Sequence, residues 1–372
     1  MISDIEIFPV LLPVKTEFKI SGGVVASASK GAPHIFVKIS NDEGMIGWGE
    51  CRPSHRWSYE TLETASSTLK NYIAPEIIGM DESDLSALHK KMNSIIANGV
   101  VTGQPIAKSA IDMAICDLNS KKANLPLRKF LSSDGLKKIK LSAIISASNP
   151  EEAIRQANDA IKEGFEGFKI KAGINTDMDL EIIKSVSSIS DKIFIIVDAN
   201  QSWDNEKTVR MSELLSTTNV SYIEQPLNAN NILDYAQIVN KCELPIALDE
   251  SIFTAQDLIN HIKLNAINAL VLKTSRSCGI YKAYEIGKIA LDNGITLLGG
   301  GLTESMLGLL ASAHLFASLG IKSPVDLNGM QFLSNSLFTE GVVTSTLVSL
   351  GDEPGIGMVE NFLGRLISDF GI

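Results

Sequence analysis

The sequence predicts an α/β protein in which a TIM-like (β/α) barrel carries a smaller α+β capping domain. The chain has 372 residues, which is too long for one small domain and suits a large domain with a smaller partner. Beyond about residue 138, short apolar runs alternate with amphipathic stretches, and ionisable residues recur where those runs end. We therefore assign 1–125 to the capping domain and 126–340 to the barrel, and expect 341–372 to return to the capping domain.

The first 125 residues are expected to combine short strands with helices. Strands are predicted at 5–12 and 35–40, where apolar and polar residues alternate in the second segment, and the Asn-Asp-Glu-Gly sequence at 41–44 turns the chain into a strand at 45–50. Segment 21–33 is rich in Gly, Ser and Ala and suits either a mobile flap or a disordered connector. Helices are expected at 61–72, 83–97 and 105–122.

The second part of the chain shows the alternation of strands and helices that is typical of a barrel. Short apolar runs separated by helical patterns indicate parallel strands joined by crossover helices. Eight runs follow this pattern: 141–146, 168–171, 193–198, 221–224, 246–249, 269–273, 296–299 and 325–328. Eight units over roughly 200 residues are at the lower end of a closed (β/α)₈ barrel. An open doubly wound sheet has the same alternation, so the texture alone leaves both folds open.

Composition argues against several classes of partner. The 33 Lys and Arg residues face 43 Asp and Glu residues, a net charge of −10, and no basic run with interleaved aromatic residues occurs, so we expect no nucleic-acid partner. The four cysteines form no C-x-x-C pair, which fits buried thiols in a reducing compartment. The chain does not begin with a basic segment before an apolar stretch, and it has no run of eighteen apolar residues. We therefore expect a cytoplasmic protein without membrane contact.

Ionisable residues end five successive barrel runs. They are Lys171, Asp198, Glu224, Asp249 and Lys273, and successive members lie 24 to 27 residues apart, about one βα unit. Because strands of a parallel barrel end at the same face, where active sites of this fold lie, all five are expected to converge on one mouth.

The three carboxylates predict a metal site. Asp198, Glu224 and Asp249 stand on adjacent strands, the third to the fifth, and offer only oxygen ligands, which suits one Mg²⁺ ion per subunit. A single Asp at a strand end is also a common N-cap of the following helix. Glu224 is poorly suited to that role because Gln-Pro follows it.

The two lysines predict an acid–base pair. Lys171 and Lys273 end the second and sixth runs, so in a ring of eight they lie opposite each other. A substrate between them would meet an amine on each face, and a metal ion would stabilise the charge that develops when the proton beside a carboxylate leaves. Lys169 lies two residues before Lys171, faces the same side of the strand, and would make the charged form of its neighbour less favourable.

These residues resemble the enolase superfamily, specifically its muconate-lactonising subgroup. The pattern K-x-K, Asp, Glu, Asp and a final Lys matches, and so do further segments over essentially the whole chain: 47–50, 107–118, 168–173, 197–200, 223–226 and 248–250. The resemblance implies an isomerase with Mg²⁺, three carboxylate ligands and Lys171 and Lys273 as catalytic residues. The mandelate-racemase branch uses a histidine on strand seven, where this chain has Leu-Gly-Gly-Gly at 298–301.

Within the subgroup the resemblance favours a dipeptide epimerase of the L-Ala-D/L-Glu type. In such enzymes an Asp-x-Asp pair on strand eight binds the peptide's ammonium, and this chain has Asp326 and Asn328 there. An amide oxygen can accept from an ammonium but carries no charge. Relatives that prefer Ala-Glu have an arginine in the first loop, and 18–25 here contains none; Arg52 and Arg56 are candidate anion ligands, or else exposed loop cations.

Other functions use the same residues. A cycloisomerase, an o-succinylbenzoate synthase or an N-acylamino acid racemase would share this acid–base frame, and a non-catalytic barrel that binds a ligand would have no need of opposed lysines. Asp326 and Asn328 could equally form a turn that leaves the strand. Barrels of this type often assemble, so we expect a homo-oligomer.

Overall fold

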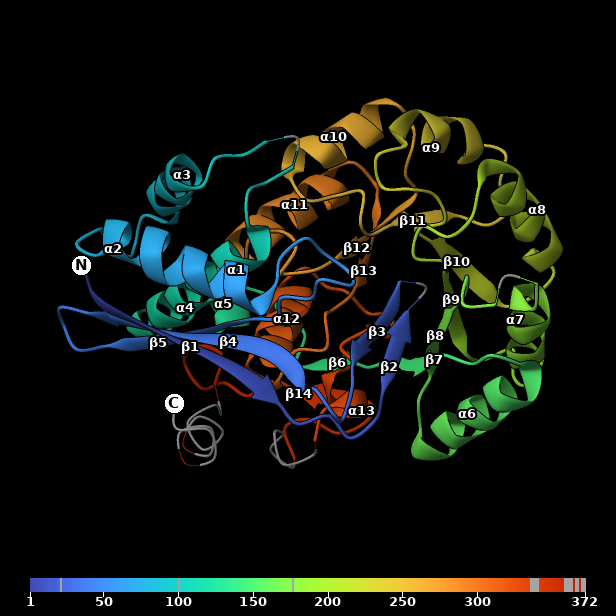
Figure 1. Cartoon of the computed structure of the whole chain (residues 1–372), viewed down its shortest axis with the longest axis horizontal. Helices are drawn as coiled ribbons and strands as arrows, with labels where there is room; N and C mark the ends of the chain where they lie inside the picture. Colours follow the sequence, from blue (N-terminus) through green and yellow to red (C-terminus); the bar gives the residue numbers. More distant parts are fainter. Residues whose placement is uncertain are drawn as a thin grey trace.

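The computed structural model describes residues 1–20, 22–99, 101–175, 177–334, 341–357, 364 and 368. Figure 1 shows an arc of parallel strands with helices on its outer side, next to a twisted antiparallel sheet with helices packed against it. The predicted fold class, a barrel with an antiparallel cap, is therefore confirmed.

The cap is built on a three-stranded antiparallel sheet. Its order is β1 (Ile2–Leu12), β4 (Ala32–Asn41) and β5 (Ile46–Cys51), so the predicted hairpin is present as β4 and β5. The helices that follow are α1 (Leu62–Ser67), the π-helical turn η1 (Thr68–Ile73), α2 (Ala74–Ile77), α3 (Leu85–Ile95), α4 (Pro105–Lys122) and α5 (Leu127–Leu131). The helix expected at 61–72 is thus interrupted by a π turn.

Two glycines of β5 let the sheet lie directly on α4. A Cβ at Gly47 or Gly49 would lie 2.0 Å from the carbonyl oxygen of Ala114 or Ala110, respectively. Only glycine permits so close an approach of strand and helix backbones. Almost every residue of α4 is consequently buried, between the cap sheet and the barrel helices.

Part of the segment expected to be either a mobile flap or a disordered connector forms a strand. β2 (Phe18–Ile20) pairs with β3 (Gly23–Ala26), and Gly23, at φ 113°, makes the tight turn that a side chain would strain. Phe18 and Ile20 are buried, and the ring of Phe18 stacks on that of Phe332, with 4.4 Å between the ring centroids. The hairpin is therefore anchored to the barrel end, beside which it lies in Figure 1.

The barrel contains seven hydrogen-bonded parallel strands in chain order. They are β7 (Ala143–Ile145), β8 (Gly167–Lys171), β9 (Phe194–Asp198), β10 (Val220–Glu224), β11 (Ile246–Leu248), β12 (Ala269–Leu272) and β13 (Thr296–Gly299). The eighth run, 325–328, is not a full strand. It makes single parallel bridges from Val325 to Leu141 and from Asp326 to Gly300, and these join the two edges of the sheet.

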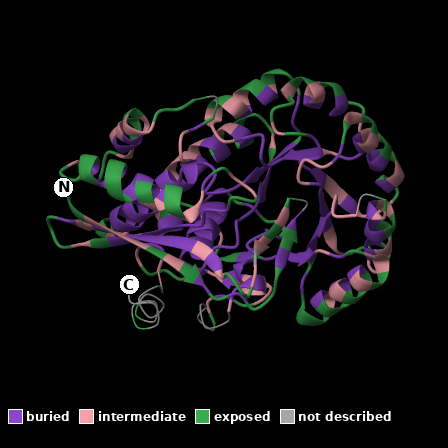
Figure 2. Ribbon diagram, viewed as in Figure 1, coloured by how far each residue is buried: buried purple, intermediate pink, exposed green. Residues whose placement is uncertain are grey.

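Helices cover the outside of this ring. They are α6 (Pro150–Glu163), α7 (Asp179–Ser187), α8 (Asn205–Leu215), α9 (Ile232–Ile238), α10 (Ala255–Lys263), α11 (Ile280–Asp292), α12 (Met306–Ser318) and the short α13 (Gly329–Phe332). Figure 2 shows that the strands are buried and that the outer helices expose one face. Helix α12 is buried on all sides, as its uniformly apolar sequence requires, since it packs between the barrel and the cap. Within the described residues, no helix is both long and apolar enough to span a membrane.

Cap carboxylates hold the first turns of two barrel helices. Glu50 of β5 accepts the backbone N–H groups of Ser305 and Gly308 at 2.7 and 2.8 Å, at the start of α12. Asp112 of α4 accepts those of Ile280 and Tyr281 at the start of α11. Negative charge is favourable at a helix N-terminus, so these contacts stabilise the fit of the cap on the barrel.

The described part of the tail, 341–357, contacts both parts. Its strand β14 (Leu347–Ser349) pairs antiparallel with β6 (Lys138–Lys140), which precedes the barrel. The backbone N–H of Ile356 donates to Asp117 of α4 at 2.8 Å. The boundaries at 125/126 and 340/341 stay predictions, and 358–372 lies outside the described residues except for 364 and 368.

Candidate active site

The predicted ionisable residues lie at the carboxyl ends of neighbouring strands. Lys171, Asp198 and Glu224 are the last residues of β8, β9 and β10, and Asp249 and Lys273 directly follow β11 and β12. The parallel register pairs Lys171 with Asp198 and Asp198 with Glu224. All five are buried, so the barrel brings them together at one edge.

Each of the three carboxylates faces a lysine. Lys171 Nζ lies 2.6 Å from Asp198 Oδ2, and Lys273 Nζ lies 2.6 Å from Asp249 Oδ2. Lys169 Nζ lies 2.9 Å from Glu224. The opposite charges largely neutralise one another, which is what permits so many ionisable groups in a buried site.

The carboxylates suit a divalent cation in their chemistry. Burial and the negative charge of Asp198 raise the pKa of Glu224 and also of Glu250, whose Oε2 accepts no hydrogen bond. Burial also acts on Asp198, but Lys171 outweighs it and the pKa is lowered. Among the described residues, no three acidic, histidine or cysteine side chains already surround a common point as ligands. The carboxylates offer only hard oxygen ligands, and a bound cation would relieve the repulsion between their negative charges. In this structure lysine side chains pair with these carboxylates.

Lys171 and Lys273 line the same cavity, although they stand at the ends of strands that are not neighbours in the sheet. Their strands, β8 and β12, are separated by β9, β10 and β11. The cavity measures about 360 Å³, open mouth included. Lys171 Nζ lies 5.8 Å from the Phe18 ring centroid and Lys273 Nζ 4.6 Å from that of Trp57, so the cap contributes an aromatic ring beside each amine.

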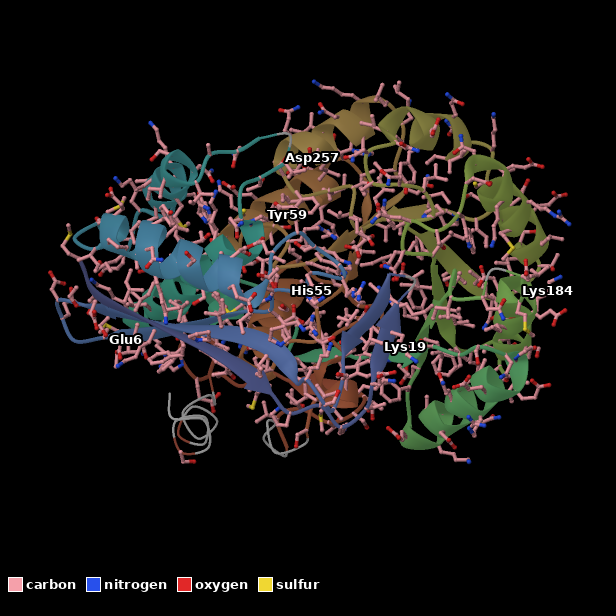
Figure 3. All side chains as sticks on the ribbon, viewed as in Figure 1. Glu6, Lys19, His55, Tyr59, Lys184 and Asp257 are labelled. Atoms are coloured by element: carbon pink, nitrogen blue, oxygen red, sulfur yellow. The ribbon has the colours of Figure 1, made fainter. Side chains whose placement is uncertain are left out.

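Two segments of the cap form the outer wall of this cavity. Phe18 and Ile20 come from β2, and Trp57 from the segment after β5. Figure 3 marks these segments by the labels Lys19 and His55. These apolar side chains were not predicted as site residues. Phe18 and Ile20, on either side of Lys19, nevertheless show the alternation of a strand with one buried face.

Lys169, Asp326 and Asn328 form a connected group. Lys169 Nζ lies 3.0 Å from Asp326 Oδ2, and Asn328 Nδ2 donates to Asp326 Oδ1 at 2.9 Å, while Asn328 Oδ1 has no partner. Burial opposes the charge of Lys169, but Asp326 and Glu224 outweigh it, so its pKa is raised. Lys169 therefore stays charged as a partner of these two carboxylates.

The two candidate arginines have different surroundings. Arg52 is fully buried and lines the cavity. Arg56 is exposed and does not belong to the cavity wall; it packs against Gly22 and Gly23 of the β2–β3 turn. The structure thus brings Arg52, but not Arg56, to the lysines.

Arg276 and Glu250 were not predicted. Arg276 follows Lys273 by three residues, pairs with Asp249 and donates to the Val271 carbonyl. Glu250 accepts from Asn200 at 3.2 Å. Both lie in loops just past strand ends, and this position is the only signal that the sequence gives for them.

Comparison with known proteins identifies the family. Residues 4–132 match the model "Mandelate racemase / muconate lactonizing enzyme, N-terminal domain", and residues 152–361 match "Enolase C-terminal domain-like". The N-succinyl-L-Arg/Lys racemase of Bacillus cereus is 30% identical over 97% of this chain and 95% of that protein. The L-Ala-D/L-Glu epimerase of Clostridium acetobutylicum is 28% identical over 96% of this chain and 98% of that protein.

A solved structure supports the same family assignment. The dipeptide epimerase of Enterococcus faecalis, in complex with Mg and L-Leu-L-Tyr, superposes with a TM-score of 0.88 at 27% identity, over 96% of this chain and 99% of that one. With the barrel, the five strand-end residues and both family models in agreement, the chain belongs to the muconate-lactonising subgroup of the enolase superfamily and is an isomerase.

Proposed function

We propose that this enzyme is a metal-dependent epimerase that transfers a proton to and from the α-carbon of the C-terminal residue of a dipeptide, Ala-Glu being the first candidate. The observation that carries the proposal is the position of Lys171 and Lys273, on strands four apart in the ring and in the wall of one cavity.

In the proposed reaction one lysine removes the α-proton from one face of the substrate. The other lysine returns a proton to the opposite face of the resulting enolate, which inverts the carbon. The aromatic rings of Phe18 and Trp57 cover the amines and help to keep water from the enolate. Because the two faces have equivalent groups, we expect interconversion without a strict stereochemical preference.

We assign Asp198, Glu224 and Asp249 as the residues that would hold one Mg²⁺ per subunit. When bound there, the ion would supply the positive charge that stabilises the substrate carboxylate as it becomes an enolate. The buried, mutually repelling carboxylates support this assignment, as does the Mg in the related dipeptide epimerase.

The substrate assignment rests on the remaining polar residues of the site. Asp326 and Asn328 are proposed to accept from the substrate's amino group, with Lys169 fixing Asp326. Of the two candidate arginines, Arg52, which lines the cavity, is the proposed ligand of an acidic side chain, and Arg56 lies outside the cavity wall. The relatives named for dipeptides support a dipeptide substrate.

An N-acylamino acid racemase is the second candidate. Lys169 and Asn328 already satisfy Asp326, and the only free acceptor of the pair is the uncharged Asn328 Oδ1. Such a group suits an amide N–H as well as an ammonium. A cycloisomerase or an o-succinylbenzoate synthase would use the same lysines and carboxylates.

The test is hydrogen exchange at the α-carbon. The protein with Mg²⁺ is incubated in heavy water with a panel of L,L-dipeptides and N-acylamino acids, and NMR follows loss of the α-proton and inversion. We expect exchange on Ala-Glu. Exchange on N-acylamino acids alone would establish the second candidate, and no exchange on any member would overturn both. The homo-oligomer and the cytoplasmic location stay predictions; light scattering tests the first.

A further inference from the structure

Arg52 is a buried cation without an ionic partner. It directly follows β5 and is 0% exposed. Its Nη2 donates to the Val25 carbonyl at 3.1 Å, whereas Nε and Nη1 have no hydrogen-bond partner in the part of the chain that the structure describes. Among the described residues, no acidic side chain forms an ion pair with it, unlike the buried Lys169, Lys171, Lys273 and Arg276.

The nearest carboxylates are occupied by other donors. Glu304 accepts the backbone N–H of Leu302 at 2.7 Å, and Glu50 caps α12. Burial raises the pKa of both, that of Glu50 to about 7, so each holds its negative charge less firmly than an exposed glutamate does. Burial lowers the pKa of Arg52 only to about 10, which leaves the guanidinium charged.

A charged group without a partner is unfavourable in a protein interior, and it is usually paired or functional. The position of Arg52 in the cavity wall favours a functional role. Arg52 lines the cavity together with both catalytic lysines, and apolar side chains such as Val25 and Leu302 line the same cavity. A planar guanidinium among apolar groups is well suited to bind a carboxylate.

We propose that Arg52 binds a second carboxylate of the substrate, distinct from the one beside the reacting carbon. This inference rests on the proposed proton transfer and restricts its substrates to dicarboxylates. The second carboxylate has two chemical sources: the side chain of an acidic C-terminal residue in a dipeptide, or the free end of a succinyl group on the amino nitrogen.

The experiment compares substrates that differ only in that carboxylate. One pair is Ala-Glu and Ala-Gln; the other is N-succinylalanine and its terminal amide. For each, kcat/KM of α-deuteration is measured with Mg²⁺ for the wild type, Arg52→Met, Arg52→Lys, Arg56→Met and the exposed control Arg155→Met. We expect the wild type to prefer the acidic member of one pair at least tenfold, and the preferred pair identifies the source.

Arg52→Met should abolish this preference, Arg52→Lys should keep part of it, and Arg155→Met should keep all of it. Equal turnover of the acidic member and its amide in both pairs by the wild type, or an unchanged preference in Arg52→Met, would overturn the inference. Loss of the preference in Arg56→Met but not in Arg52→Met would assign the carboxylate to Arg56 instead.

Two outcomes call for a further measurement: an Arg52→Met variant that does not fold, and a panel in which no compound exchanges. If Arg52→Met does not fold, as judged by circular dichroism, the Arg52→Lys ratio decides. If no compound exchanges, the proposed function fails, and calorimetry with Mg²⁺ then tests Arg52 by itself: tighter binding of the acidic members, lost in the Arg52 variants, supports it, and equal binding contradicts it.

Discussion

The ammonium of Lys273 lies 4.6 Å from the ring centroid of Trp57, so a residue at the end of a barrel strand meets one from the segment after β5. A ring in this position stabilises a cation by about 0.5–2 kcal/mol. Replacing Trp57 by Leu keeps an apolar side chain but removes this contact and opens the wall. We expect kcat/KM for proton exchange to fall by about tenfold, which corresponds to roughly 1.4 kcal/mol, with little change in Tm. A wild-type rate in this variant would show that the ring has no part in catalysis.

Removal of either lysine should stop epimerisation. General acid–base catalysis contributes about 10²- to 10⁴-fold, so Lys171→Ala and Lys273→Ala should lose at least that much in inversion rate. Each variant retains one amine and should still exchange the α-proton of the stereoisomer that presents it to that amine. Chiral chromatography measures inversion and NMR measures exchange; full inversion by either variant would contradict the assignment.

Removal of the metal should abolish exchange reversibly. Treatment with EDTA should stop α-deuteration and added Mg²⁺ should restore it. In calorimetry, Asp198→Asn, Glu224→Gln and Asp249→Asn should each weaken Mg²⁺ binding by about tenfold or more, since each loses a charged oxygen ligand. The exposed Asp191→Asn variant serves as the matched control and should bind as the wild type does. Unchanged affinity in all three site variants would remove these carboxylates from the metal site.

Stability should decline between pH 4.5 and 7 because of Glu60. Burial raises its pKa from 4.5 to about 7, although the backbone N–H groups of Ile106 and Ala107 donate to it. Over this range the unfolded chain releases a proton that the folded chain retains, so the free energy of unfolding falls as pH rises through the window. Glu50, with a similar pKa, acts in the same direction.

Glu60→Gln removes one of these two titrations. Chemical denaturation at pH 5 and pH 8 should therefore give a smaller difference in unfolding free energy for Glu60→Gln than for the wild type. The exposed Glu243→Gln variant should keep the wild-type difference. An identical pH dependence in all three proteins would show that Glu60 does not retain its proton in the folded state.

The contact between β5 and α4 predicts a large stability effect. A methyl group at Gly49 would lie 2.0 Å from the Ala110 carbonyl oxygen, a backbone atom that cannot turn away. We expect Gly49→Ala to destabilise the protein by about 3 kcal/mol or more, because overpacking of this kind forces the backbone to move. Gly99→Ala, where nothing lies within 4 Å, should change the unfolding free energy by less than about 0.5 kcal/mol.

The barrel could be predicted because its strands are buried on both faces. Such strands appear as continuous apolar runs, and the first polar residue after each run marks the strand end. Lys171, Asp198 and Glu224 lie where this rule puts them. The eighth run makes only isolated bridges, since its ladder depends on how the two sheet edges approach each other, which no local pattern encodes.

The lining of the cavity was less accessible to sequence reasoning. Trp57 reaches Lys273 only because the cap docks on the barrel, and Arg276 reaches Asp249 through the path of a loop. Lys169 was expected mainly to disfavour the charge of Lys171; its ion pairs with Glu224 and Asp326 show that it chiefly balances carboxylates. These are long-range pairings, and a single sequence carries no direct record of them.

The pairing of β14 with β6 also bears on how the protein is made. Leu347 pairs with Lys140, so among the described residues this edge of β6 has no strand partner until the chain has been synthesised as far as β14. During translation that edge is open to foreign strands, which makes the nascent barrel prone to aggregate. A premature stop between residues 329 and 346 would leave the edge of β6 without this partner even though every residue of the cavity had been synthesised.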